Sequence, residues 1–191
     1  VANGGYSMAT AARALSEYLE HKDPLSITGH YLSRVEPGKA LLEVEKLNIG
    51  RSVSTASLKF IQDGEEKIRF TSCFTNFSKA KGDTLREVEA PNFPPIEDCI
   101  HMPYIKGFTP VLEKQLDRRF APYSNWWDEE RPRERAFLDA YYAWPGGESI
   151  DLFSVIFFLD TMSPPIFNRL GSRGWVPSLE LTLHLKQIPS P

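Results

Sequence analysis

The chain has 191 residues, of which 41% are hydrophobic and 25% are charged, a composition typical of a folded globular protein. Its net charge of -3 comes from 22 basic and 25 acidic residues spread along the sequence, and this balance excludes the basic surface that a nucleic-acid partner requires. No window approaches the roughly 18 apolar residues of a membrane helix, and the first residues lack the pattern of a signal peptide.

Cys73 and Cys99 are the two cysteines of the chain. They have neither the number nor the spacing of a disulfide framework or a zinc site. We therefore expect two free thiols in a reducing, cytoplasmic setting. We expect no metal and no cofactor.

The first part of the chain predicts one helix followed by an antiparallel meander of strands. Residues 3–5, Asn-Gly-Gly, form a turn signal, and apolar residues then recur at helical spacing over residues 6–20. After residue 24 the apolar pattern changes to period two, which is typical of half-buried strands. Turn residues separate four such strands, over residues 27–32, 40–47, 53–62 and 68–77.

The second part begins after a proline-rich stretch of weak periodicity, which we interpret as a linker. This interpretation gives three segments, namely a first domain at residues 1–80, a linker at 81–104 and a second domain at 105–191. The second domain is expected to contain strands over 107–120 and 135–143, a helix over 150–161 with Ser149 as its N-cap, and a strand over 175–185.

Asp160 is the leading catalytic candidate. The apolar run of residues 150–159 ends on this carboxylate, and Pro164 and Pro165 then stop the helix. A carboxylate beside a buried segment is costly unless another group pairs with it or the protein uses it. The alternative is a helix-end residue that binds the following turn through Thr161 and Ser163.

Several motifs, taken in order, resemble a known family. They are G-G-Y before an alanine-rich helix, H-Y-L-x-R-x-x-P-G, G-R-S-V-S-T, F-I-Q-D-G, L-D on the apolar helix and W-V-P-S-L-E-L-T-L-H-L. Their order and spacing resemble the double-hotdog acyl-CoA thioesterases, the type II thioesterase group. The resemblance implies an α+β fold of two hotdog units, each an antiparallel sheet wrapped around a central helix. It also implies that the fold is incomplete at both ends of this sequence.

The resemblance further implies hydrolysis of acyl-CoA thioesters to free acid and CoA. In the family an aspartate on the second central helix, a Ser or Thr at the next strand and a glutamine on a late strand activate the attacking water. Asp160 and Ser178 match the first two, and the glutamine is expected beyond Pro191. Ser178 has the alternative of simply starting a strand.

Three further residues are expected to bind substrate. The backbone N–H groups of Gly5 and Tyr6 would point at the thioester carbonyl, because helix N-termini present unpaired donors. Arg51 would bind a phosphate of coenzyme A, with an ordinary surface arginine as its alternative. Gln62 lies where a first-half counterpart of the glutamine would be, but the pattern favours a residue at a hairpin edge.

Other functions remain open. The segment G-Y-S-M-A resembles the nucleophile elbow of serine hydrolases, with Ser7 as nucleophile, although few residues precede it to form the required strand. A hotdog hydratase needs a histidine five positions after its aspartate, where this chain has Pro165. The main alternative is a catalytically incomplete hotdog protein that binds acyl-CoA or acyl groups. In either case the family suggests a homo-oligomer that associates through sheet edges.

Overall fold

The computed structural model describes residues 2–83, 85, 87–104, 111–128, 134–172, 174 and 176–190. The chain divides into two compact units. Unit 1 comprises Val1–Gly82, Ile150–Thr161 and Pro177–Pro191, and unit 2 comprises Asp83–Ser149 and Met162–Val176. The domain boundaries expected from the sequence, at residues 80 and 104, stay a prediction.

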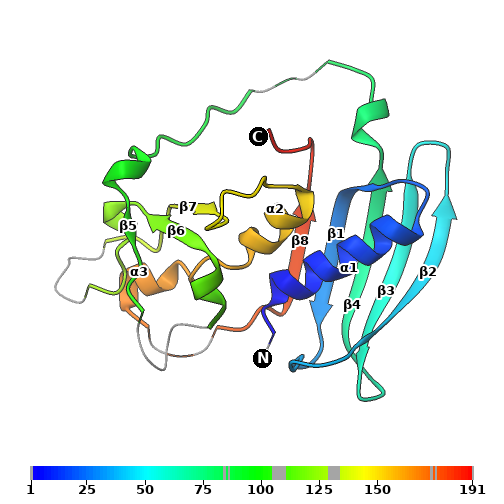
Figure 1. The fold of residues 1–191 in the computed structure, drawn as a ribbon, viewed down its shortest axis with the longest axis horizontal. Helices are drawn as coiled ribbons and strands as arrows, with labels where there is room; N and C mark the ends of the chain where they lie inside the picture. The colour runs from blue at the N-terminus through cyan, green and yellow to red at the C-terminus, as the bar shows by residue number, and fades with distance from the viewer. Residues whose placement is uncertain are drawn as a thin grey trace. The chain divides into compact units, whose positions relative to one another are not determined.

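Unit 1 is built on a five-stranded antiparallel sheet with the strand order β2-β3-β4-β1-β8 (Figure 1). Its strands are β1 (Asp23–Tyr31), β2 (Leu41–Ile49), β3 (Ser54–Gln62), β4 (Glu65–Thr75) and β8 (Glu180–His184). The last strand follows the others by more than a hundred residues in the chain, yet it pairs with β1, with Thr28 opposite Thr182. The sheet therefore joins both ends of the sequence.

The expected meander is correct for β2, β3 and β4 but wrong for β1, which pairs with β4 rather than with β2. The lengths of the connections explain the difference. Asp63 and Gly64 form a two-residue hairpin with φ of 54° and 78°, the left-handed geometry that Asp-Gly favours, and this turn holds β3 beside β4. Residues 32–40 separate β1 from β2, and a connection of this length lets β1 cross to the far side of β4.

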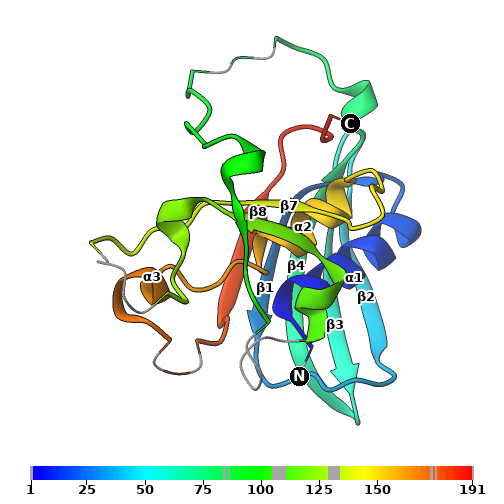
Figure 2. The same cartoon turned by 60° about the vertical axis from the view of Figure 1, so that its left-hand side comes forward.

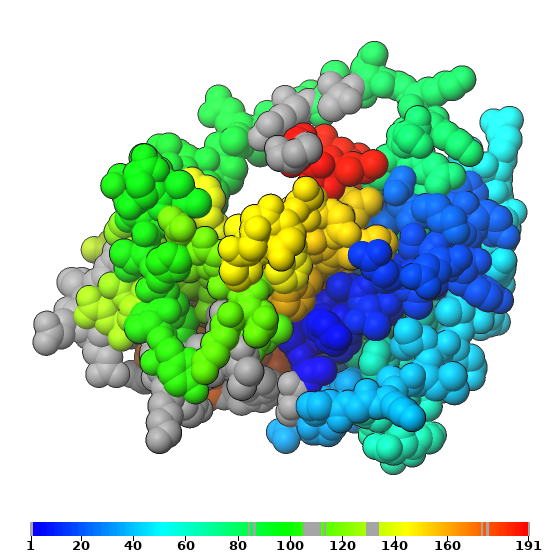
Figure 3. Space-filling view, viewed as in Figure 1, coloured from blue at the N-terminus to red at the C-terminus, as the bar shows by residue number. Residues whose placement is uncertain are grey.

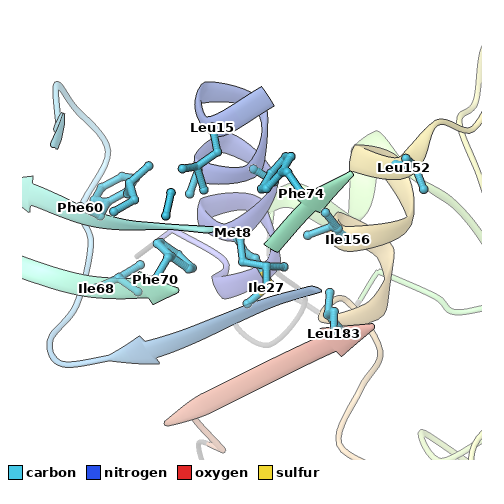
Figure 4. Packing of buried hydrophobic residues seen from close by; sticks show 14 of the residues in the cluster. Met8, Leu15, Ile27, Phe60, Ile68, Phe70, Phe74, Leu152, Ile156 and Leu183 are labelled. Carbon is cyan, nitrogen blue, oxygen red and sulfur yellow. The ribbon is translucent and has the colours of Figure 1, made fainter. Parts of the chain in front are cut away.

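Two helices pack on the sheet of unit 1, α1 (Gly4–Tyr18) and α2 (Leu152–Leu159). They lie side by side (Figures 1 and 2) and share one apolar core with the strands. Figure 4 shows this core between the helices and the sheet, including Met8, Leu15, Ile27, Phe60, Ile68, Phe70, Phe74, Leu152, Ile156 and Leu183. The other side of α1 forms part of the surface in Figure 3.

The helix α2 is shorter than the sequence predicts and begins at a different cap. Asp151, not Ser149, is the N-cap, because its side chain accepts the backbone N–H of Ser154 while Ser154 accepts the N–H of Asp151. The pattern predicted a capping residue correctly but placed it two positions early. Within the described residues, no helix has both the length and the apolar character needed to cross a membrane.

Unit 2 contains the three-stranded antiparallel sheet β5-β6-β7 and the short helix α3 (Ile166–Leu170). The strands are β5 (Ile100–His101), β6 (Asp117–Phe120) and β7 (Ala140–Ala143). They are shorter than predicted, since residues 111–115 form a 3-10 helix and residues 105–110 lie outside the described part. An aromatic core of Phe120, Trp126 and Phe167 holds this unit together, so Trp126 has a packing role.

Candidate active site

Asp160 lies where three segments of unit 1 meet. It is the C-cap of α2, and its side chain reaches the first turn of α1 and the residues before β8. The backbone N–H of Gly5 donates to Oδ2 at 2.7 Å, and the hydroxyl of Ser178 donates to Oδ1 at 2.9 Å. The structure thus brings together Asp160, Ser178 and Gly5. The carboxylate binds these two residues rather than the turn that follows it.

The two helix ends act on this carboxylate in opposite directions. The C-terminus of α2 carries partial negative charge and disfavours an anion, whereas the N-terminus of α1 carries partial positive charge and favours one. The bond from Gly5 places the anion on the favourable helix end. Asp160 remains partly exposed.

Gly4 and Gly5 allow α1 to approach Asp160 closely. A Cβ atom on Gly5 would lie 2.7 Å from the carbonyl oxygen of Phe157 and 2.8 Å from Cβ of Asp160. A Cβ atom on Gly4 would lie 2.8 Å from Oδ2 of Asp160. The glycine pair therefore does more than start a helix, because a side chain at Gly5 would push the helix end away from the carboxylate.

Ser178 precedes β8 by two residues, as expected for a residue that leads into this strand. Its main chain is fixed by the neighbouring pairing, in which the N–H of Tyr31 donates to the carbonyl of Leu179 at 2.9 Å. This bond extends the β1–β8 ladder beyond the strand itself. The position of the Ser178 hydroxyl is therefore set by the sheet.

Asn3 is a site residue for which the sequence pattern indicated only a turn. Its Oδ1 accepts the N–H of Tyr6 at 2.9 Å and so caps α1, while its Nδ2 donates to the backbone carbonyl of Asp160 at 3.1 Å. One amide therefore links the start of α1 to the end of α2. An asparagine directly before a helix is a standard N-cap signal and indicates the first of these bonds.

Tyr31 is the second residue that sequence reasoning missed. Its hydroxyl donates to the carbonyl of Gly4 at 3.0 Å, and its ring packs edge-on against Phe70. Burial, and to a lesser degree the negative charge of Asp160, raise the pKa of Tyr31 well above its ordinary value. The hydroxyl consequently stays protonated and remains a donor at neutral pH.

The backbone donors expected to bind the thioester carbonyl are engaged inside the protein. Gly5 donates to Asp160, and Tyr6 donates to Asn3. The side chain of Tyr6 is exposed and contacts Phe157 edge-on. In this arrangement the N–H of Gly5 donates its hydrogen bond to the carboxylate of Asp160.

Arg51 lies at the other end of α1. It belongs to the turn between β2 and β3, and its carbonyl contacts Nε2 of His21, which follows the C-terminus of the helix. A helix of 15 residues is roughly 22 Å long at a rise of about 1.5 Å per residue. The structure therefore does not bring Arg51 to Asp160.

Two other candidates have packing roles. Ser7 lies within α1, is 2% exposed and donates to the carbonyl of Asn3 at 3.2 Å, so it does not occupy a strand-to-helix elbow. Gln62 is buried and exchanges two hydrogen bonds with the main chain of Glu36, at 2.9 and 3.0 Å. It holds the loop that follows β1, as a residue at a hairpin edge can.

The part of the chain that the structure describes contains no group of three or more His, Cys, Asp or Glu side chains that could hold a metal ion. The chemistry available at Asp160 is that of a carboxylate. Within the described residues, Oδ2 accepts the N–H of Gly5 and Oδ1 accepts the hydroxyl of Ser178, and each carboxylate oxygen has further lone pairs that can accept from a water molecule. Such a group can take a proton from water next to an activated carbonyl.

Comparisons with known proteins agree with the resemblance found in the sequence. Residues 1–75 match the model of the acyl-CoA thioesterase N-terminal domain, and residues 96–191 match that of the acyl-CoA thioesterase C-terminal domain. A search among curated proteins finds no match. The paired domain models confirm the expected tandem arrangement.

Solved structures show the same fold. A protein of Thermobifida fusca YX assigned as a thioesterase II is 26% identical with a TM-score of 0.84, over 99% of this chain and 71% of that protein. A hot dog fold protein of unknown function from Alicyclobacillus acidocaldarius is 20% identical with a TM-score of 0.77, over 95% of this chain and 66% of that protein. A protein of Novosphingobium aromaticivorans assigned as a thioesterase is 22% identical with a TM-score of 0.76, over 98% of this chain and 71% of that protein. The hotdog fold expected from the sequence is confirmed.

Proposed function

The chain belongs to the acyl-CoA thioesterase family, and from this premise we propose that Asp160 activates the water that hydrolyses an acyl-CoA thioester. The observation that supports the proposal most strongly is the bond of 2.9 Å between the Ser178 hydroxyl and Oδ1 of Asp160. It joins two residues that lie in different segments of the chain and that the family resemblance had assigned to one water.

The direction of this bond gives each residue a role. Because the Ser178 hydroxyl donates its proton to Asp160, its oxygen keeps lone pairs that accept from water. A water that donates one proton to Asp160 and the other to Ser178 has an oxygen lone pair left for the thioester carbon. Two fixed acceptors therefore orient the nucleophile before the reaction begins.

The reaction then proceeds by general base catalysis. Asp160 takes a proton as the water oxygen forms a bond to the carbonyl carbon. The tetrahedral intermediate collapses, the carbon–sulfur bond breaks, and the thiolate of coenzyme A leaves and takes the proton from Asp160, which restores the base. We assign the Gly5 N–H to the carboxylate, where it stabilises the charged form of the base.

The remaining expectations from the sequence belong to this proposal. We expect acyl-CoA as the substrate, a glutamine as a third residue at the water, and a homo-oligomer. Cys73 and Cys99 are free thiols, which is compatible with the expected cytoplasmic setting.

The test is hydrolysis of acyl-CoAs of several chain lengths by the full-length protein and by Asp160→Asn. We expect the variant to lose at least about a hundredfold in kcat, the order of effect of a missing general base. Asp63→Asn is a matched control, because Asp63 lies in the β3–β4 turn, where asparagine also adopts a positive φ.

Two results would contradict the proposal. Unchanged hydrolysis by Asp160→Asn would show that another group activates the water. A wild-type protein that retains acyl-CoA but hydrolyses none of the chain lengths would support the alternative of a catalytically incomplete binding protein.

A further inference from the structure

One peptide group connects Tyr31 with Asp160. The carbonyl of Gly4 and the N–H of Gly5 belong to the same peptide bond, and each end makes one side-chain hydrogen bond. The Tyr31 hydroxyl donates to the carbonyl at 3.0 Å, and the N–H donates to Oδ2 of Asp160 at 2.7 Å. The chain of bonds runs from the tyrosine through the peptide to the carboxylate.

Such an arrangement strengthens the bond to the carboxylate. Resonance couples the two ends of a peptide group, so a hydrogen bond accepted by the carbonyl shifts charge and makes the N–H a better donor. An N–H that donates to an ionised carboxylate forms one of the stronger hydrogen bonds in proteins. The hydroxyl also fixes the plane of the peptide and thereby the direction of the N–H.

Tyr31 is well held for this role. Its ring packs edge-on against Phe70, a fully buried residue of β4. Its main-chain N–H donates to the carbonyl of Leu179, the residue after Ser178. The side chain of Tyr31 therefore contacts the peptide group that binds Asp160. The main chain of Tyr31 contacts the segment that contains Ser178.

We propose that Tyr31 is a positioning residue of the thioesterase site. It directs the Gly5 N–H at Asp160 through the Gly4–Gly5 peptide and so fixes the orientation of the carboxylate that acts as the base. This inference rests on the proposed role of Asp160. Tyr31 itself does not touch the reacting atoms in the proposal. Its effect reaches the reaction only through Asp160.

A purely structural role makes different predictions. If the hydroxyl only satisfied the carbonyl of Gly4, its loss would lower stability and leave the turnover of the folded protein unchanged. If it positions the base, its loss lowers kcat in fully folded protein. Substrate affinity should be nearly unaffected in the second case, because no substrate contact is removed.

The decisive variant is Tyr31→Phe, which keeps the ring and its contact with Phe70 but removes the hydroxyl. We expect kcat for acyl-CoA hydrolysis to fall about 3- to 10-fold, the effect of one net hydrogen bond, with KM changed less than about 2-fold. Tyr18→Phe is the matched control, since Tyr18 is exposed at the far end of α1.

A second measurement does not depend on activity. In protein labelled with 15N-glycine, the Gly5 amide proton should resonate downfield in the wild type, and both Tyr31→Phe and Asp160→Asn should move it upfield. An unmoved Gly5 resonance in Tyr31→Phe would overturn the inference. So would a moved resonance together with wild-type kcat.

These outcomes separate the inference from the proposed function. If Asp160→Asn abolishes hydrolysis and Tyr31→Phe changes neither turnover nor the Gly5 resonance, only the inference fails. If Asp160→Asn hydrolyses acyl-CoA normally, the proposed function fails, and the inference fails with it because Tyr31 would then have no base to position.

Discussion

The amide of Gly5 donates to the carboxylate of Asp160 at 2.7 Å although the two residues are 155 positions apart in the chain. A Cβ atom at Gly5 would overlap the carbonyl of Phe157 and Cβ of Asp160. We therefore predict that Gly5→Ala separates the end of α2 from the start of α1. The variant should fold with a stability loss of about 1 to 3 kcal/mol, as for overpacked sites, and should lose most of its thioesterase activity.

Denaturant unfolding and acyl-CoA hydrolysis of the same preparation measure the two effects. Activity should fall further than the unfolded fraction accounts for, because the carboxylate loses its donor in the folded protein as well. A Gly5→Ala protein with wild-type kcat would show that the close approach of α1 is not needed for turnover.

The hydroxyl of Ser178 gives a second prediction. Ser178→Ala should lower kcat about 10- to 100-fold, because a hydrogen bond to a charged group contributes about 1.5 to 3 kcal/mol and the water also loses one acceptor. Ser178→Thr should retain most of the activity, since threonine offers the same hydroxyl. Ser52→Ala, at an exposed position in the β2–β3 turn, serves as control. Equal activity of Ser178→Ala and the wild type would remove Ser178 from the proposed mechanism.

The sequence predicted those parts of the fold that local patterns determine. The apolar spacing of α1, the composition of α2 and the Asp63-Gly64 turn each depend on residues close together in the chain. The pairing of β1 with β4 and β8 depends on contacts between distant segments, and no local pattern encodes it. The strands of unit 2 were predicted too long because short apolar runs occur equally in loops and 3-10 helices.

The candidate site likewise contains residues that the sequence indicated and a residue that only the folded structure reveals. Asp160 stood out because a carboxylate ends an apolar run, and Ser178 was identified only through the family resemblance. Tyr31 could not be found, because its role depends on the distance between its hydroxyl and the Gly4 carbonyl, which only the packed sheet and helix establish. The phosphate-binding role expected of Arg51 stays a prediction. Arg51 lies beyond the C-terminus of α1 and is therefore not one of the residues that gather around Asp160.

Tyr31 should also affect stability at alkaline pH. Its pKa is raised in the folded state, chiefly by burial and further by the charge of Asp160, so folding favours the protonated phenol. This contribution is fully present below the unfolded pKa of about 10 and is lost as pH rises toward the folded value. We predict that the free energy of unfolding of the wild type, measured against Tyr31→Phe, falls by up to about 1.4 kcal/mol per pH unit above pH 10. Denaturant titrations from pH 8 to 11 measure this difference, and a constant difference would contradict the prediction.

The cap of α2 allows a test that compares two neighbouring positions. Asp151 forms the capping box with Ser154, whereas Ser149 precedes the helix and is exposed. Burial alone would raise the pKa of Asp151, but the hydrogen bonds from Ser154 and the charge of Arg13 outweigh it, so the pKa is lowered. A lowered pKa contributes stability above the unfolded value of about 3.9, and this contribution is lost as pH falls through the folded value.

We therefore predict that Asp151→Ala lowers the free energy of unfolding by about 1 kcal/mol at pH 7, the usual effect of a lost N-cap, and that the difference from the wild type narrows below about pH 4. Ser149→Ala should leave stability within about 0.5 kcal/mol of the wild type at both pH values, as for an ordinary surface change. Denaturant unfolding at pH 7 and at pH 3.5 measures both variants. A larger loss for Ser149→Ala than for Asp151→Ala would mean that the helix starts where the sequence pattern alone had placed it.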